Sequence, residues 1–161
     1  MKRLFLLVAL GAVFPAGQAL AKDWSEMTES EMRQALYYDP GNALGHAWLG
    51  YLLDANGNYD EAAAEFRQAL LIDPDYIYAH YSLANTLYKK GDYPQAETEY
   101  IRTLRLDPDY AEAHYGLGTA YYMQKMYIQA REEFHEALRL MPNYPEVYPE
   151  QGDFMVRFLS Q

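Results

Sequence analysis

Three histidines are the residues of this sequence whose type and spacing most readily suggest chemistry. His46, His80 and His114 are each 34 residues from the next. Histidine is the commonest metal ligand in proteins, so a regular series raises the question of zinc. Equivalent places on successive packed helices lie about 10 Å apart, whereas two zinc ligands must approach within roughly 3.5 Å. With no acidic third ligand expected beside them, we interpret these histidines as half-buried packing residues and predict no metal site.

Carboxylates are plentiful but show no catalytic arrangement. Glu132, Glu133 and Glu136 stand beside Arg131 and Arg139, a mixture of charges that is typical of a solvated helix face. The sequence contains no nucleophile-elbow motif, zinc-protease motif or glycine-rich phosphate loop. We therefore predict that the protein is not an enzyme and that it uses no cofactor.

The spacing of the histidines extends to many other positions. A period of about 34 residues is typical of a helix–turn–helix repeat. Small residues at two places of the period allow two helices to approach closely, and larger apolar residues fill the remaining space. The prolines are Pro40, Pro74, Pro108 and Pro142; the small residues are Gly50, Ala84 and Gly118 with Ala62, Ala96 and Ala130; the larger ones are Leu49, Leu83 and Leu117 with Phe66, Tyr100 and Phe134; and Tyr59, Tyr93 and Tyr127 also recur.

On these residues the sequence resembles the tetratricopeptide-repeat (TPR) family over roughly residues 23–160. The resemblance implies an all-α solenoid of seven or eight helices, with three full repeats at 43–76, 77–110 and 111–144. A half repeat at 23–42 and a capping helix at 145–160 are expected to close the two ends. Asp23 and Glu26 are spaced as a capping box, which predicts a helix from about residue 23 to 38. The closing helix is expected to be kinked at Pro149 or to start there.

Two positions depart from the pattern. Lys125 stands where the earlier repeats have Gly57 and Gly91, so this turn must differ from the others or carry strain of ~1 kcal/mol. Thr103 replaces the alanine of the other repeats and is expected to loosen the packing between the second and third repeats.

The first twenty-one residues have the pattern of a secretory signal peptide. Lys2 and Arg3 precede an uncharged apolar run at 4–14, and small residues occupy positions 19 and 21. An uncleaved membrane anchor is the alternative, but this run is well short of the ~20 residues that span a bilayer. We predict cleavage near Ala21, a mature TPR domain at 22–161 in the periplasm or outside the cell, and no membrane span after cleavage.

The charge of the chain restricts its partners. The formal net charge is −10 and there are no cysteines. An anionic surface repels phosphate backbones, so nucleic acid is a poor partner. The absence of cysteine excludes disulfides and thiolate metal sites. A protein or peptide partner is therefore expected.

The resemblance implies that the first helix of each repeat lines a concave surface where partners bind. Tyrosine is suited to such a surface because its ring is rigid and apolar while its tip is polar. Asn85 could pair with a peptide backbone through both its donor and its acceptor. The expected function is a protein-binding adaptor or scaffold of the bacterial cell envelope. The alternative is a self-associating protein or homo-oligomer, whose groove holds its own C-terminal tail or a second copy. The candidate groove residues are Tyr51, Tyr78, Tyr81, Asn85, Tyr88, Lys89, Tyr115, Thr119 and Tyr122.

Overall fold

The computed structural model describes residues 23–161, and in that range all regular structure is helical. A short 3₁₀ helix, η2 (Trp24–Glu26), precedes the first α-helix. The α-helices are α2 (Glu29–Tyr38), α3 (Ala43–Ala55), α4 (Tyr59–Ile72), α5 (Ile77–Lys89), α6 (Tyr93–Leu106), α7 (Ala111–Met123), α8 (Tyr127–Leu140), α9 (Tyr144–Val147) and α10 (Pro149–Leu159). The predicted signal peptide at 1–21 lies outside the described residues.

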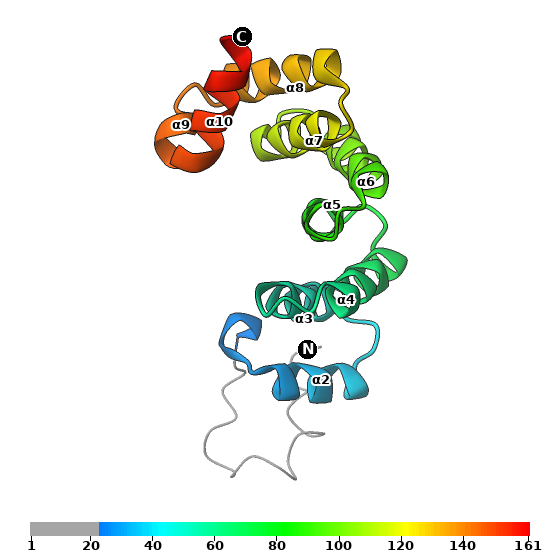
Figure 1. Ribbon diagram of the computed structural model, residues 1–161. Coiled ribbons are helices and arrows are strands. Elements are labelled where there is room, and N and C mark those ends of the chain that lie inside the picture. The colour runs from blue at the N-terminus through cyan, green and yellow to red at the C-terminus, as the bar shows by residue number, and fades with distance from the viewer. Residues whose placement is uncertain (1–22) are drawn as a thin grey trace.

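The helices stack in chain order into an open arc (Figure 1). The helix pairs α3/α4, α5/α6 and α7/α8 form the three repeats, and each pair contacts the next one along the chain. α3 also contacts α5, and α5 contacts α7. The first helices therefore form a continuous inner layer, while α4, α6 and α8 lie on the outside of the arc. The predicted TPR-type solenoid is confirmed.

The core lies between the two helices of each repeat, where small residues meet aromatic rings. Phe66, Tyr100 and Phe134 are almost fully buried, as are Leu49 and Leu83. A Cβ atom added at Gly118 would come within 2.6 Å of the Phe134 ring, so only glycine permits this approach. The small and large places of the repeat are thus complementary surfaces of one interface.

The first α-helix of the described chain begins later than the sequence predicted. Asp23 caps only the short 3₁₀ helix, and the capping box is formed instead by Thr28 and Glu31 at the start of α2. The Thr28 hydroxyl accepts from the Glu31 amide at 3.3 Å, and the Glu31 carboxylate accepts from the Thr28 amide at 2.8 Å. Since this box satisfies two amides of the first helical turn, the prediction of a helix from residue 23 was wrong.

The turn at Lys125 keeps the geometry of the other repeats and bears the strain. Gly57 and Gly91 have φ of 81° and 82°, and Lys125 has φ of 64°. Its amide donates to the Tyr122 carbonyl, as the Gly91 amide does to Tyr88. A lysine is therefore held in the left-handed region that favours glycine.

Thr103 is accommodated within the interface that it was expected to loosen. Its side chain is fully buried, and its hydroxyl donates to the Glu99 carbonyl at 3.0 Å, one turn back in the same helix. The polar atom is therefore satisfied without a partner from the next repeat.

The closing helix is divided in two at the proline. α9 ends at Val147 and α10 begins at Pro149, as the missing proline N–H and the ring of Pro149 require. A Cβ atom at Gly152 would lie 2.2 Å from Cα of Pro145, so glycine allows α10 to fold back onto α9. Met155 of α10 is fully buried against the last repeat, which caps the stack. Within residues 23–161, no helix is both long and apolar enough to cross a bilayer.

Candidate protein-binding surface

A histidine–glutamate pair fixes the two helices of every repeat relative to each other. Nδ1 of His46, His80 and His114 lies 2.6, 2.7 and 2.6 Å from a carboxylate oxygen of Glu65, Glu99 and Glu133, respectively. Nε2 of each ring lies 3.0–3.1 Å from the carbonyl of the proline that precedes the repeat. Each ring thus joins the first helix, the second helix and the preceding turn.

These pairs correct the sequence interpretation in one respect. An acidic residue does repeat beside the histidines, 19 positions further on, and Glu133 faces His114 rather than solvent alone. Both ring nitrogens face oxygen acceptors, so the imidazolium form can donate at both. Burial by itself would lower the pKa of His114, but the hydrogen bonds to Glu133 and to the Pro108 carbonyl outweigh it and raise that pKa.

The histidines are structural in the described part of the chain. Their ring nitrogens are already engaged, and residues 23–161 contain no group of three histidine or acidic side chains that could hold a metal ion. Each histidine–glutamate pair restrains the first helix of a repeat relative to the second helix, so the pairs stiffen the contact of α3, α5 and α7 with the outer helices.

Two predicted tyrosines of the inner layer pack against a tyrosine that ends the same repeat. The ring of Tyr81 lies 4.9 Å from that of Tyr110, and Tyr115 lies 5.2 Å from Tyr144. Sequence reasoning did not select Tyr110 or Tyr144, although tyrosine recurs at position 34 of every repeat, beginning with Tyr76. That recurrence was the available signal.

A second set of tyrosines packs ring against ring at the far end of the same helices. Tyr88 lies 5.4 Å from Tyr93, and Tyr122 lies 5.6 Å from Tyr127. These contacts lie within a repeat, between the last turn of the first helix and the first turn of the second. The inner tyrosines therefore serve the fold with one face and leave only part of the ring for a partner.

Tyr51 and Tyr78 are the predicted groove tyrosines with the largest free area. Tyr51 is 51% exposed and Tyr78 is 38% exposed. The Tyr51 ring meets Trp48 edge-on at 5.9 Å, so it is supported from one side and open on the other. Rigid, half-supported rings of this kind lose little entropy when a partner covers them.

The predicted polar groove residues already have intramolecular partners. The amide oxygen of Asn85 accepts a hydrogen bond from the Tyr100 hydroxyl at 2.6 Å, which uses the acceptor that was expected to meet a peptide. Lys89 pairs with Asp54. Thr119 is buried and donates to the Gly116 carbonyl at 2.8 Å.

The C-terminal helix covers one end of the predicted groove. Phe154 and Phe158 of α10 meet the Tyr122 ring at 5.1 and 5.4 Å. At the start of α10 the Tyr148 hydroxyl donates to the Glu112 carboxylate at 3.0 Å. α10 thus packs on the last repeat and covers the Tyr122 ring. Tyr51 and Tyr78, nearer the N-terminus, stay exposed.

Burial keeps four tyrosines of the repeats, Tyr78, Tyr81, Tyr110 and Tyr115, neutral at physiological pH. Burial is the main cause that raises the pKa of Tyr78, Tyr81 and Tyr115, and it raises the pKa of Tyr110 to about 12. Their hydroxyls therefore stay protonated, and they can donate to carbonyl or carboxylate groups of a partner.

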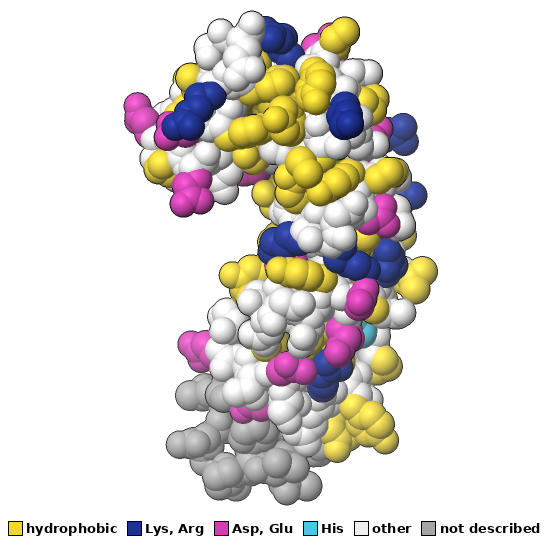
Figure 2. Space-filling model, in the orientation of Figure 1, with side chains coloured by type: hydrophobic (Ala, Val, Ile, Leu, Met, Phe, Trp, Pro, Cys, Tyr) yellow, Lys and Arg dark blue, Asp and Glu magenta, His cyan; other side chains and the backbone are white. Residues whose placement is uncertain are grey.

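Hydrophobic and charged side chains are unevenly distributed over the visible face of the arc. In Figure 2 the hydrophobic side chains gather over the part formed by α7, α8 and α10, and the molecule is hollowed on its inner side between α9 and α5. Acidic side chains are more prominent over α3 and α4. This face therefore shows hydrophobic side chains together with scattered charge.

Family models match most of the described chain. A model described as TPR repeat matches residues 53–91 and 84–125. Two further models described as tetratricopeptide repeat match residues 111–144 and 32–64. No curated protein sequence matches the chain significantly.

Solved structures share the fold at low sequence identity. A crystal structure of MamA has a TM-score of 0.72 and 20% identity, and 82% of each chain is covered. A second structure of MamA protein has a TM-score of 0.71 at 20% identity, covering 82% of this chain and 77% of that one. MamA from Desulfovibrio magneticus RS-1 has a TM-score of 0.69 at 19% identity, with 82% and 80% covered.

Proposed function

Because the chain belongs to the tetratricopeptide-repeat family, we propose that it is a protein-binding scaffold that holds a partner protein on the inner surface of the arc. The observation that carries the proposal is the rigid inner layer formed by α3, α5 and α7, with Tyr51 and Tyr78 exposed on it. Tyrosine and the other aromatic residues are enriched in the interfaces through which proteins bind other proteins.

The inner surface favours an extended or helical segment that offers apolar side chains and hydrogen-bond acceptors. The Tyr51 ring, supported by Trp48, provides flat apolar area, and the protonated hydroxyl of Tyr78 provides a donor. An aromatic anchor at the centre of an interface typically contributes at least ~2 kcal/mol when truncated to alanine. Tyr51 and Tyr78 are the exposed inner rings that we assign as such anchors.

The proposed place of action is the bacterial cell envelope. The support is the sequence of residues 1–21, in which two basic residues are followed by an apolar run and by small residues at 19 and 21. This order is the pattern of a secretory signal peptide. N-terminal sequencing of the protein purified from its native host is expected to start at Lys22. Recovery of the intact N-terminus from the cytoplasm would contradict the envelope assignment.

Partner capture with surface variants tests the proposed binding role. Tyr51→Ala and Tyr78→Ala remove exposed rings, whereas alanine at Tyr81 or Tyr115 would also disturb the packing within a repeat. Tyr37, which is 81% exposed on α2, provides the matched control. We expect the double variant to lose partners that wild type and Tyr37→Ala retain, at equal helical content by circular dichroism. Equal capture by all three proteins would contradict the assignment of the inner surface.

Self-association is the second candidate, and exposed apolar residues at the C-terminal end favour it. Val147 at the end of α9 and Val156 on α10 are about half exposed. Because Met155 is fully buried, deletion of α10 would open the core, so a point variant is the better test. If self-association is the function, Val156→Asp should convert an oligomer to a monomer in light scattering, and an unchanged mass rejects this interface.

A further inference from the structure

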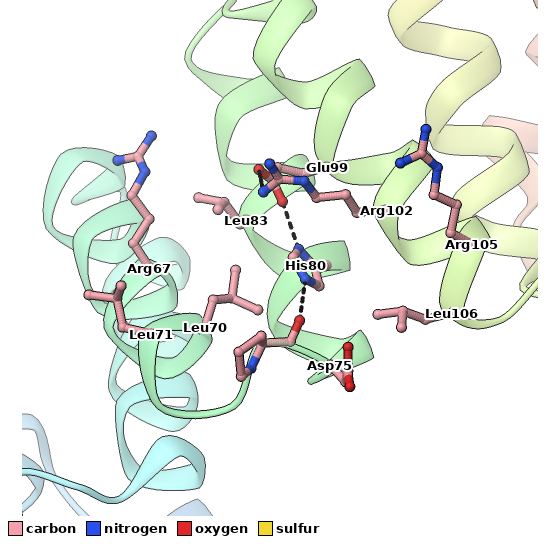
Figure 3. Close-up of a pocket in the computed structure, with 11 residues that line it drawn as sticks. Arg67, Leu70, Leu71, Asp75, His80, Leu83, Glu99, Arg102, Arg105 and Leu106 are labelled. Atoms are coloured by element: carbon pink, nitrogen blue, oxygen red, sulfur yellow. Dashed lines mark hydrogen bonds and ion pairs between the residues drawn. The ribbon is translucent and has the colours of Figure 1, made fainter.

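A pocket on the outer side of the arc lies between the first and second repeats. Its volume is about 630 Å³. α4 contributes Arg67 and Leu71, and α6 contributes Arg102, Arg105 and Leu106 (Figure 3). His80 of α5 lies between these two helices and pairs with Glu99 of α6. The pocket is separate from the inner tyrosine surface because the outer helices form most of its wall.

Three arginines in one pocket are unusual in a chain of formal net charge −10. Arg67 and Arg105 stand on opposite sides of the pocket, with Arg102 between them in the view of Figure 3. Arg102 is paired with Glu99 at 3.0 Å, and the same carboxylate also meets His80 at 2.7 Å. The carboxylate of Glu99 is therefore already compensated. Asp75 is the other carboxylate that lines the pocket, and among the described residues neither carboxylate forms an ion pair with Arg67 or Arg105.

Arg67 lacks the carboxylate that the equivalent arginine has one repeat earlier. Arg33 pairs with Glu61 at 2.6 Å across two helices. One repeat later the same two places hold Arg67 and Gln95, and the Arg67 guanidinium donates to the neutral amide oxygen of Gln95 at 3.4 Å. The geometry is retained while the negative charge is removed.

Arg105 lacks its carboxylate for a similar reason. In the third repeat Arg139 pairs with Glu136, three residues earlier, at 2.6 Å. In the second repeat the place of Glu136 is taken by Arg102. Among the described residues, no ion pair or hydrogen bond engages the Arg105 guanidinium. Two guanidinium groups are thus left with unused donors around one pocket.

Apolar side chains surround these donors. Leu71 is 75% exposed and Leu106 is 36% exposed, and Leu70 also lines the pocket. An inorganic anion would use the arginines but leave this apolar area in water. A nucleic acid would meet the repulsion of the acidic chain. An acidic peptide with apolar side chains matches both features, since carboxylates suit arginine forks and the leucines accept apolar groups.

We propose that this pocket is a second protein-binding site, which takes an acidic segment of a partner protein through Arg67 and Arg105 and seats an apolar side chain of that segment against Leu71 and Leu106. The site allows the protein to hold two partners, one on each side of the arc. It is independent of the inner surface.

The test uses the full mature protein and fluorescein-labelled eight-residue peptides in fluorescence anisotropy. The probe alternates glutamate and leucine, and two controls replace the glutamates by glutamine or the leucines by serine. We expect the probe to bind at least fivefold more tightly than either control and to weaken as NaCl rises from about 50 to 500 mM. Equal binding of all three peptides, or of the probe and the serine control, would overturn the proposal, as would displacement by millimolar inorganic phosphate.

Variants assign the binding to the pocket. Arg67→Gln and Arg105→Gln should each weaken the probe about fivefold, the effect expected of an exposed ion pair at the upper end of its range. The matched controls Arg33→Gln and Arg139→Gln, at the same places of neighbouring repeats, should leave binding unchanged. Equal losses of affinity in the two sets of variants would show that only the net charge of the protein matters, and would reject the pocket as the binding site.

A second kind of variant keeps both arginines and changes only their partner. Gln95→Glu gives Arg67 the carboxylate that Arg33 already has, so it should weaken the probe about as much as Arg67→Gln does. Tyr78→Ala, on the inner surface, should not affect the probe. If Tyr78→Ala abolishes binding and Gln95→Glu does not, the acidic peptide binds the inner surface and the proposed outer site is wrong.

Discussion

Lys125 offers a direct test of how strictly the repeat geometry is imposed on the sequence. The turn between α7 and α8 has the same hydrogen bonds as the turns that contain Gly57 and Gly91, yet Lys125 holds φ at 64°. For a residue with a Cβ atom the left-handed conformation costs roughly 1–2 kcal/mol. We predict that Lys125→Gly stabilises the protein.

The expected magnitude follows from two opposing contributions. Glycine removes the conformational penalty of the folded state. It also increases the entropy of the unfolded chain, which lowers the free energy of unfolding by roughly 0.5–1 kcal/mol. At Gly57 and Gly91 no atom lies within 4 Å of an added Cβ, which indicates that the side chain at this place makes little contact. The net gain is about 0.5–1 kcal/mol in the free energy of unfolding. For a domain of this size, the gain corresponds to a rise in Tm of about 1–4 °C.

Urea denaturation followed by circular dichroism measures this effect, with Lys125→Ala as the matched control. Alanine removes the lysine side chain and keeps the Cβ atom, so it should leave the free energy of unfolding close to that of wild type. Gly91→Ala should destabilise the protein by a similar ~1 kcal/mol. If Lys125→Gly is no more stable than Lys125→Ala, the turn is not strained and the reasoning from φ is refuted.

Three further predictions concern the contacts within repeats. Because the folded-state pKa of His114 is raised, the stability that this pairing contributes is complete below the unfolded pKa and is lost as pH rises through the folded pKa. His114→Phe should therefore reduce the fall in the free energy of unfolding between pH 6 and pH 8, as urea titrations measure it. Gly118→Ala should destabilise the protein by about 1–3 kcal/mol, since the new Cβ meets the Phe134 ring at 2.6 Å. An unchanged midpoint of urea unfolding would show that the ring moves aside freely and would contradict this expectation. Tyr100→Phe removes the hydroxyl that donates to Asn85 and should cost about 1 kcal/mol in thermal unfolding, whereas no loss would mean that this hydrogen bond makes no net contribution.

The fold was predictable because the sequence pattern for the contact between the two helices of a repeat recurs in every repeat. The small residue at position 8 and the aromatic ring at position 24 of each repeat identify two surfaces that must meet, as Gly118 and Phe134 do. The break at Pro149 follows from the chemistry of proline. The start of α2 was missed because two capping boxes compete at the N-terminus, and the sequence does not show that the box at Thr28 prevails over Asp23.

The candidate surface was only partly predictable, because a repeat position does not state which side of a residue is free. Tyr81 and Tyr51 both lie on first helices, but Tyr81 packs on Tyr110 and Tyr51 is half exposed. The partners of Asn85 and Lys89 lie in other helices, and no local pattern reveals them.

The glutamates of the histidine pairs and the arginines of the outer pocket illustrate opposite cases. Glu65, Glu99 and Glu133 recur at one position, so their omission was a failure to extend the register. Arg67 and Arg105 occupy different places of different repeats. Only the stacking of α4 beside the α5/α6 pair brings them to one pocket.

Site-specific photocrosslinking in the native host tests the central claim most directly. A photoreactive phenylalanine analogue is placed at Tyr51 or Tyr78 on the inner helices, and at Ile128, which is exposed on the outer helix α8. The account predicts a crosslinked partner band from both inner positions and none from Ile128. Crosslinks from Ile128 without any from Tyr51 or Tyr78 would contradict a binding role for the inner surface.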